Sequence, residues 1–145
     1  MRTRRPLGLN LAWAMLALMA CQATPPASAE HPFDGSWAVT VSCPTAADGA
    51  LAYIYRFGGE VRGGVLTAQN GREGTPGYLQ LRGAIRPDGT GTLAAEGVTG
   101  QAEYVVGGVG TMRRYTYTVP VRFEGAAGNG RRTEARICDL NFRRQ

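Results

Sequence analysis

The residues of this chain best suited to chemistry are its three cysteines, Cys21, Cys43 and Cys138. A thiol can form a disulfide, bind a metal or accept a lipid, and its place along the chain favours one of these. Cys21 falls in the N-terminal apolar segment, which leaves Cys43 and Cys138 as an even pair. Two thiols and His31, the only histidine, make a poor zinc set. We therefore expect a Cys43–Cys138 disulfide, with no metal site and no cofactor.

A catalytic role would need a nucleophile beside a base that a third group orients. We expect His31 to lie in a linker ahead of the first strand, where the sequence offers it no orienting partner. The glycines between Gly97 and Gly110 do not match a phosphate-binding loop, because neither a lysine nor a helix follows them. The sequence therefore predicts a protein that is not an enzyme.

Aromatic side chains at alternate positions of predicted strands are the candidates for a binding site. The tyrosines are Tyr53, Tyr55, Tyr115 and Tyr117, and Trp37 lies on a separate strand. Inside a barrel, their rings would contact an apolar ligand and the tyrosine hydroxyls would hydrogen-bond it. The alternative for the tyrosines is a filled core, because an eight-stranded barrel can be just wide enough for its own side chains. For Trp37, a core position is the simpler interpretation.

Two pairs of adjacent arginines, Arg113-Arg114 and Arg131-Arg132, could bind an anion at one end of such a barrel. Solvated charges beside turns are the simpler interpretation. The chain carries a net charge of +5. Without residues 1–29, however, 13 arginines face 11 acidic residues, for a net charge of +2. Binding of nucleic acid therefore has little electrostatic support.

The N-terminal segment has the layout of an export signal. Three arginines precede an apolar run, Leu7 to Ala20, that is too short to cross a bilayer as a helix. We expect residues 1–29 to be a cleaved signal peptide. The alternative is a lipoprotein signal over residues 1–20, with Cys21 lipidated and the membrane contacted only through that lipid. Either way we expect an exported protein, periplasmic or secreted, or lipid-anchored in the bacterial envelope.

After a linker over residues 30–35, the domain over residues 36–145 consists of short strands without a convincing helix. In the first strand, Trp37, Val39, Val41 and Cys43 share one side, the alternation of a half-buried strand. The predicted strands cover residues 36–43, 51–62, 65–69, 79–85, 90–97, a short segment around 104–106, 114–124 and 131–143.

A disulfide between the first and last strands requires those strands to be neighbours. A meander whose ends meet is a closed up-and-down barrel of roughly eight antiparallel strands, and closure removes exposed sheet edges. The sequence therefore predicts an all-β barrel, with a two-sheet β-sandwich as the alternative.

Two hairpins carry predictions of register. The type I turn Arg86-Pro87-Asp88-Gly89 sets Leu79 opposite Gly97, so that a large side chain meets a small one. Nearer the C-terminus, pairing of opposite charges sets Glu124 opposite Arg132. We also expect a bulge or a sharp bend at Gly58-Gly59, as glycine within a strand often marks, and a bulge near Ile137–Cys138, where the alternation of the last strand changes phase.

The segment Gly35-Ser36-Trp37 resembles the Gly-x-Trp signature of the lipocalin/calycin superfamily. This resemblance implies that Trp37 packs at the closed end of a barrel, under Arg143 or Arg144 from the last strand. The chain is also similar to a group of small secreted bacterial proteins, and that likeness implies no activity. It is carried by Phe33-Asp34-Gly35-Ser36-Trp37, Cys43-Pro44, Gly130-Arg131-Arg132 and Cys138-Asp139.

Taken together, these patterns favour a non-enzymatic exported barrel that binds either a small apolar ligand or a protein partner of the envelope or exterior. A small-ligand carrier predicts an open cavity among the tyrosines. A protein-binding module, for example a protease inhibitor, predicts a filled interior with an ordered loop at 70–77 or 97–110. A structural envelope lipoprotein is a third class and requires lipidation of Cys21.

Overall fold

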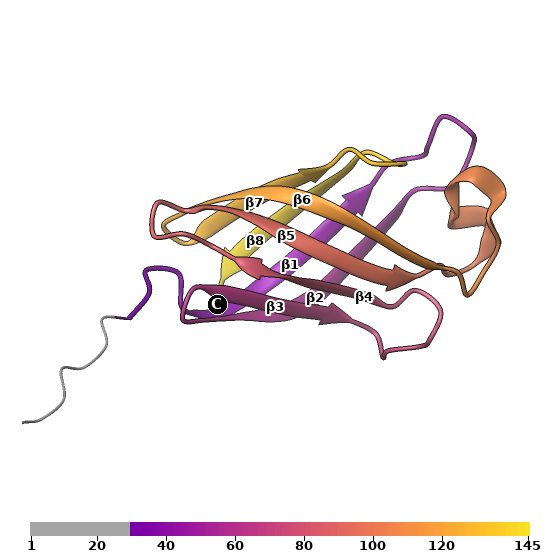
Figure 1. Cartoon of the computed structure of the whole chain (residues 1–145). Helices are drawn as coiled ribbons and strands as arrows, with labels where there is room; N and C mark the ends of the chain where they lie inside the picture. Colours follow the sequence, from indigo (N-terminus) through magenta and orange to yellow (C-terminus); the bar gives the residue numbers. More distant parts are fainter. Residues whose placement is uncertain (1–29) are drawn as a thin grey trace, which may run out of the picture.

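The computed structural model describes residues 30–145, and these form a closed antiparallel barrel of eight strands (Figure 1). The expected signal peptide and the lipidation of Cys21 lie outside the described residues. Within residues 30–145, no helix is long and apolar enough to span a membrane.

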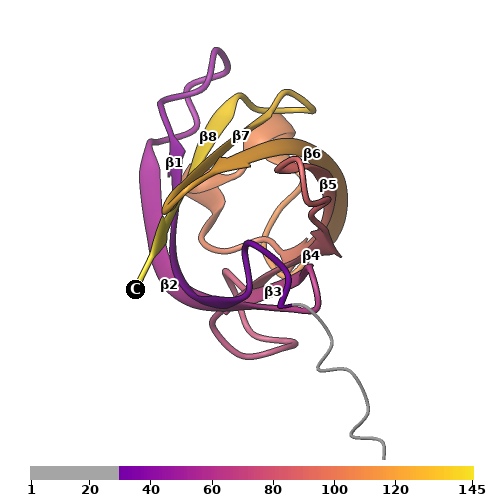
Figure 2. The ribbon, with the colours of Figure 1, turned by 90° about the vertical axis from the view of Figure 1, so that its left-hand side faces the viewer.

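Each strand of the barrel pairs with its neighbours in sequence, and β1 pairs with β8 to close the ring (Figure 2). The strands are β1 (Gly35–Cys43), β2 (Tyr53–Arg62), β3 (Val65–Asn70), β4 (Leu79–Ala84), β5 (Thr90–Val98), β6 (Arg114–Glu124), β7 (Ala127–Arg132) and β8 (Cys138–Arg144). The predicted all-β barrel is confirmed, and the closure excludes the alternative of a β-sandwich.

The seam between β1 and β8 carries the predicted disulfide. The pairing of these strands runs from Trp37 opposite Arg144 to Ser42 opposite Asp139. The next position of the same register is the Cys43–Cys138 bridge, in which the Cα atoms are 4.3 Å apart. The covalent bond therefore joins two strands that the backbone hydrogen bonds already hold together.

The β4–β5 hairpin has the register that its turn predicts. Leu79 lies opposite Gly97, and the Arg86 N–H donates to the Thr90 carbonyl at 2.8 Å. The expected bulge at Gly58-Gly59 does not form, because β1 and β2 pair without a break along their length. A Cβ at Gly59 would lie 2.7 Å from the Cβ of Ala68, so this glycine makes room for β3 rather than for a bulge.

The C-terminal part differs from the sequence prediction. The expected strand over residues 131–143 is interrupted: its first two residues end β7, which begins at Ala127, and its residues from Cys138 onward belong to β8. Glu124 lies opposite Ala127 rather than Arg132. Gly128 explains this register, because a Cβ there would lie 2.8 Å from the ring of Phe123. Packing of a large ring over a glycine outweighs a surface charge pair worth about 0.2–1 kcal/mol.

The break in alternation near Ile137 is a connection and not a bulge. Residues 133–137 join β7 to β8, and Ile137 is half exposed. The short strand expected around residues 104–106 is also absent from the described structure, which has two 3₁₀ turns there, η1 (Ala102–Tyr104) and η2 (Val106–Gly108). The number of strands is therefore as predicted. The segment around 104–106 forms no strand, and the C-terminal part forms β7 and β8 where a single last strand was expected.

One end of the barrel is closed by packed side chains. Trp37 has no exposed surface, and its ring meets that of Phe123 edge-on at 5.0 Å. Residues 31–34, assigned to a linker from the sequence, lie across this end, with Phe33 in the core. Arg144 places its guanidinium carbon 5.1 Å from the Trp37 ring and donates to the Asp34 carbonyl at 2.8 Å.

Candidate functional site

The opposite end of the barrel contains a cavity of about 910 Å³. Its wall consists of the ends of β2, β3, β5, β6 and β7 together with the loops 71–78, 99–113 and 133–137. The interior is therefore filled in the half that holds Trp37 and open in the half that holds the tyrosines. The two alternatives that the sequence left open, a cavity and a filled core, each describe one half of the barrel.

Three of the four predicted tyrosines line this cavity, namely Tyr53, Tyr55 and Tyr115. Tyr53 and Tyr55 are neighbours on the inner face of β2, with ring centroids 4.8 Å apart. Tyr115 stacks parallel to Tyr117 on β6, at 6.0 Å between centroids. Tyr117 is buried and is not part of the cavity wall. Trp37 lies at the closed end, away from the cavity.

The tyrosine hydroxyls are neutral hydrogen-bonding groups. Burial raises the pKa of Tyr53, Tyr55 and Tyr115, and it raises that of Tyr117 to about 12. Desolvation has this effect because it disfavours the charged phenolate. Within residues 30–145, the hydroxyls of Tyr53, Tyr55 and Tyr115 form no hydrogen bond to another protein group. They are therefore available to a molecule in the cavity.

Arg132 brings a positive charge among the tyrosines. This last residue of β7 faces the interior, and its guanidinium carbon lies 4.0 Å from the centre of the Tyr117 ring and 5.7 Å from that of Tyr115. Its Nε donates to the Glu134 carbonyl at 2.9 Å. The stacking on Tyr117 and this hydrogen bond together orient the side chain.

The arginine pairs of the sequence separate in the structure. Arg113 and Arg114, at the start of β6, are exposed and line the cavity. Arg132 lines it from the end of β7. Arg131 faces outward and lies 3.9 Å from the Asp139 carboxylate. Three of the four arginines therefore line the cavity, and the fourth lies on the outer face of β7.

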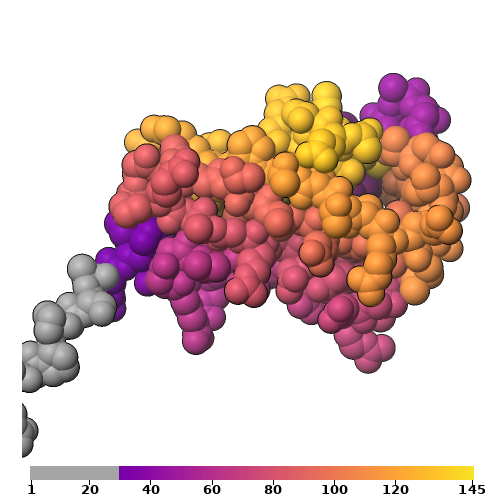
Figure 3. All heavy atoms as spheres, viewed as in Figure 1, coloured from indigo at the N-terminus to yellow at the C-terminus, as the bar shows by residue number. Residues whose placement is uncertain are grey.

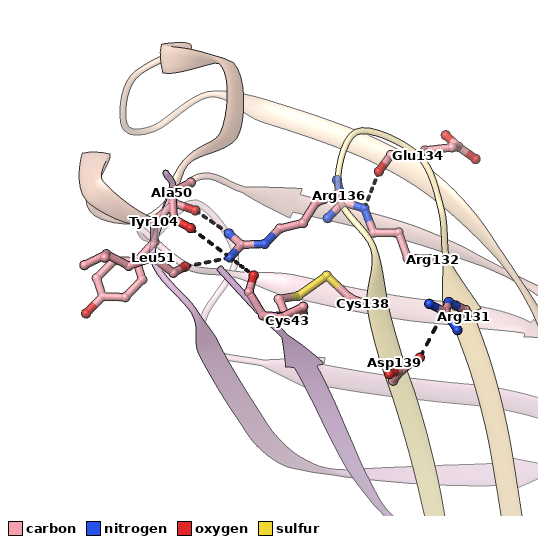
Figure 4. Close-up of a disulfide and its surroundings, with 11 residues drawn as sticks. Cys43, Ala50, Leu51, Tyr104, Arg131, Arg132, Glu134, Arg136, Cys138 and Asp139 are labelled. Carbon is pink, nitrogen blue, oxygen red and sulfur yellow. Dashed lines mark hydrogen bonds and ion pairs between the residues drawn. A yellow bond between two sulfur atoms is a disulfide. The ribbon is translucent and has the colours of Figure 1, made fainter. Parts of the chain in front are cut away.

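Arg136 is a further arginine at the cavity, and it is 5 % exposed. Figure 4 shows its guanidinium among backbone carbonyls beside the Cys43–Cys138 bridge. It donates to the carbonyls of Leu51 at 2.7 Å, Tyr104 at 3.0 Å and Ala50 at 3.3 Å, and also to that of Pro44. This one side chain thus connects the β1–β2 loop to η1.

Two more hydrogen bonds hold these loops together. The Leu51 N–H donates to the Glu103 carbonyl at 2.8 Å, and the Gly107 N–H donates to the Asp48 carboxylate at 2.7 Å. The two loops lie against each other at the right-hand end of the molecule (Figure 3). The wall of the cavity is therefore a set of connected loops and not separate flaps.

Sequence reasoning missed two members of this site, Tyr104 and Arg136. Tyr104 meets Tyr53 edge-on, with centroids 6.4 Å apart, and both line the cavity. Each of the two residues falls in a segment predicted as a strand, in which no pattern distinguishes it. Burial of an arginine with carbonyl partners from the β1–β2 loop and η1 depends on the tertiary fold and has no sequence signal.

His31 lies at the closed end of the barrel. Its Nδ1 is 4.0 Å from the Asp34 carboxylate, and its ring covers Gly64 of the β2–β3 turn. The Asp34 carboxylate accepts the N–H groups of Gly63 and Gly64, which lowers the pKa of this acid. The contacts of His31 therefore belong to the packing of residues 31–34. In the described part of the chain, no three metal-ligating side chains gather.

The fold and the cavity together define a closed eight-stranded barrel with a ligand-sized chamber at one end. No family model, no curated protein and no solved structure matches the chain. Any functional interpretation must therefore rest on the residues of the cavity itself.

Proposed function

We propose that this protein binds a small molecule in the open half of its barrel. The observation that carries the proposal is the cavity of about 910 Å³ lined by Tyr53, Tyr55, Tyr104 and Tyr115. Ligand pockets for small molecules enclose about 300–1,000 Å³ and combine apolar walls with a few polar groups. Aromatic rings with unused hydroxyls supply both kinds of contact.

The sequence suggested an apolar ligand, and the apolar part of the wall is suited to one. Besides the tyrosines, it contains Pro76, Val98 and the residues Val105, Val106 and Val109 of the loop 99–113. A molecule with a ring or a short apolar body would bury its surface against these side chains, at about 25 cal/mol per Å².

A protein partner is the second candidate, and one observation favours it. The loops at the open end expose apolar side chains, among them Leu51, Val109 and Met112. Such groups at the edge of a cavity are suited to contact with another protein. An inhibitor-like module needs no cavity, however, so the open interior favours the small ligand.

We assign binding rather than catalysis to this site. Phenols whose pKa is raised are poor bases at neutral pH, and His31 lies at the other end of the barrel. The disulfide indicates an oxidising compartment. We therefore keep the proposal of an exported binding protein, with lipid anchoring at Cys21 as the alternative to cleavage of residues 1–29.

Native mass spectrometry tests this proposal on protein purified gently from an exporting bacterial host. We expect a reproducible added mass that denaturation releases. Tyr55→Ala should lower the fraction that carries this mass, because Tyr55 lines the cavity. Ile54→Ala is the matched control, since Ile54 is exposed on the outer face of the same strand.

A bare mass for the gently purified protein would contradict the proposal and favour the protein partner. The same spectrum gives the mass of the mature chain, which identifies its first residue. It therefore decides between a chain that starts at Glu30 and one that starts at a lipidated Cys21.

A further inference from the structure

We infer that the ligand of this cavity carries an acidic group, a carboxylate, sulfonate or phosphate, and that Arg132 binds it. This inference deepens the proposed function and rests on it, because it presupposes that the cavity takes a ligand. Its first support is the balance of charge in the wall. The wall contains Arg113, Arg114, Arg132 and Arg136 and no aspartate or glutamate.

These four arginines form no ion pair with a carboxylate of residues 30–145, although Asp48 lies near enough to Arg136 for the two charges to interact. The ion pairs within residues 30–145 involve His31, Arg62 and Arg131, and none involves an arginine of the cavity. The nearest candidate in sequence, the Glu134 carboxylate, accepts from the N–H and hydroxyl of Thr118, at 3.3 and 3.2 Å. Arg132 donates from Nε to the backbone carbonyl of Glu134, and its other polar neighbour is the Tyr117 phenol.

Arg132 has the geometry of a binding group. Its Nε is used by the Glu134 carbonyl, while its two terminal amino groups have no carbonyl or carboxylate acceptor among residues 30–145. The face of the guanidinium lies 4.0 Å from the Tyr117 ring centre. The side chain is thus held at Nε and against the Tyr117 phenol, and its terminal amino groups face no acidic partner. The edge that these amino groups form matches two oxygens of one acid group.

The surroundings strengthen an interaction with an anion. The tyrosines remain uncharged, because burial raises their pKa, so they do not offset the arginines. Arg136 adds a buried positive charge whose hydrogen-bond acceptors are all neutral carbonyls. In a partly desolvated chamber, unpaired charges of one sign attract the opposite charge more strongly than they would in water.

Arg113 and Arg114 are suited to attracting an anion to the cavity rather than to holding it there. Both are exposed where they line the cavity, and the Arg113 N–H donates to the Thr99 hydroxyl at 2.9 Å. Exposed arginines increase the rate at which an anion arrives more than they increase its final affinity. A ligand that uses both the arginines and the tyrosines has an acidic group at Arg132 and an aromatic or apolar body against the tyrosine rings.

Two fluorescent probes that differ by one acid group test this inference. They are 8-anilinonaphthalene-1-sulfonate and N-phenyl-1-naphthylamine, which share the same aromatic rings. We expect the unmodified protein to bind the sulfonate about tenfold more tightly, the factor that one charge-assisted interaction supplies. This preference should decline as the salt concentration rises.

The variant Arg132→Gln should lose most of this preference, while its affinity for the amine probe stays within about twofold. Arg131→Gln is the matched control. It removes the same charge from the neighbouring residue, which faces outward and lies near Asp139. It should leave the affinities for both probes unchanged, and circular dichroism checks that both variants are folded.

The outcomes separate this inference from the proposed function. Equal binding of both probes to the unmodified protein overturns the acidic ligand and leaves the binding cavity standing. Binding of neither probe overturns both proposals. An equal loss in Arg131→Gln and Arg132→Gln overturns the role of Arg132, because it would show an effect of net charge. The comparison of probes on the unmodified protein stands even where Arg132→Gln does not fold.

Discussion

The arginines of the cavity show that the partners of a side chain decide what it does. Arg136 is buried, and its guanidinium donates to four backbone carbonyls, so its hydrogen bonds hold loops together. Arg132 lies four positions earlier and gives one hydrogen bond to a backbone carbonyl, which leaves its terminal edge to a ligand. Arg131 faces outward and lies near Asp139. The residue type is the same in all three cases, and the fold assigns the roles.

Asp48 supplies a prediction at the scale of one residue. Its carboxylate accepts the Gly107 N–H at 2.7 Å and the Ala50 N–H at 3.2 Å, and the first of these is the main cause of its lowered pKa. A group with a lowered folded-state pKa stabilises the fold above its unfolded pKa, and this contribution is lost as the pH falls through the folded value. The contact between the β1–β2 loop and η2 should therefore persist at neutral pH and weaken only below pH 3.8.

An NMR titration of the Gly107 amide proton measures this contact directly. We expect its chemical shift to change with a midpoint below 3.8, because the carboxylate that accepts this proton becomes protonated there. In Asp48→Asn the shift should not follow that titration. A midpoint at or above 3.8 in the unmodified protein would show that the hydrogen bond does not form in solution.

At the scale of elements, the open end is built from loops and the closed end from strands. The β1–β2 loop, η1 and the connection 133–137 meet at the Arg136 guanidinium (Figure 4). Without that side chain, the carbonyls of Pro44, Ala50, Leu51 and Tyr104 would lose a charged donor, and fewer hydrogen bonds would join the β1–β2 loop to η1. The position of Tyr104 in the wall therefore depends on Arg136.

Arg136→Met tests this arrangement. It keeps an unbranched apolar side chain and removes the donors, so we expect the free energy of unfolding to fall by about 2–3 kcal/mol. Urea denaturation measures the change. Arg131→Met is the matched control and should cost less than about 1 kcal/mol, because exposed charges contribute little. Equal losses in the two variants would contradict the role of Arg136 as the link between loops.

At the scale of the whole molecule, the barrel has a filled half and an open half. The rings of Trp37, Phe123 and Phe142 fill the closed half, and the Phe123 and Phe142 centroids are 4.9 Å apart. The tyrosines and arginines surround the other half. A rigid closed end of this kind supports a cavity, because the strands that carry the tyrosines continue into a tightly packed core.

The disulfide gives the prediction for the whole molecule. It joins residues 95 positions apart in sequence, and the chain-entropy model assigns a loop of this length about 4–5 kcal/mol. The double variant Cys43→Ala/Cys138→Ala should lose up to this amount in urea denaturation. It should nevertheless keep the barrel, because β1 and β8 remain paired from Trp37 to Ser42.

Far-ultraviolet circular dichroism of the double variant checks that the strands persist. The reduced form of the unmodified protein is the control and should lose a similar amount of stability. Loss of the β-sheet signal in the double variant at low temperature would contradict this prediction. It would mean that the covalent bond, and not the backbone pairing, closes the barrel.

The sequence alone determined the strands with clear alternation and the features that follow from them. Trp37 to Cys43 and Tyr115 to Phe123 alternate strictly, so the order of their residues is enough to assign their inward faces. The turn Arg86-Pro87-Asp88-Gly89 determined its hairpin because turn geometry acts over a few residues. The cysteine pair then required the ends of the meander to meet, and the barrel follows from that requirement.

Only the tertiary structure decided the C-terminal register and the make-up of the cavity. Gly128 and Phe123 pair because a ring needs the space above a glycine, a contact that depends on two strands at once. The boundary between the filled and the open part of the interior lies at Tyr117, and it depends on how eight strands close. The same is true of the burial of Arg136 among carbonyls of distant segments. Alternation in one strand tells which side chains face inward, but the space that they enclose is set by all the strands together.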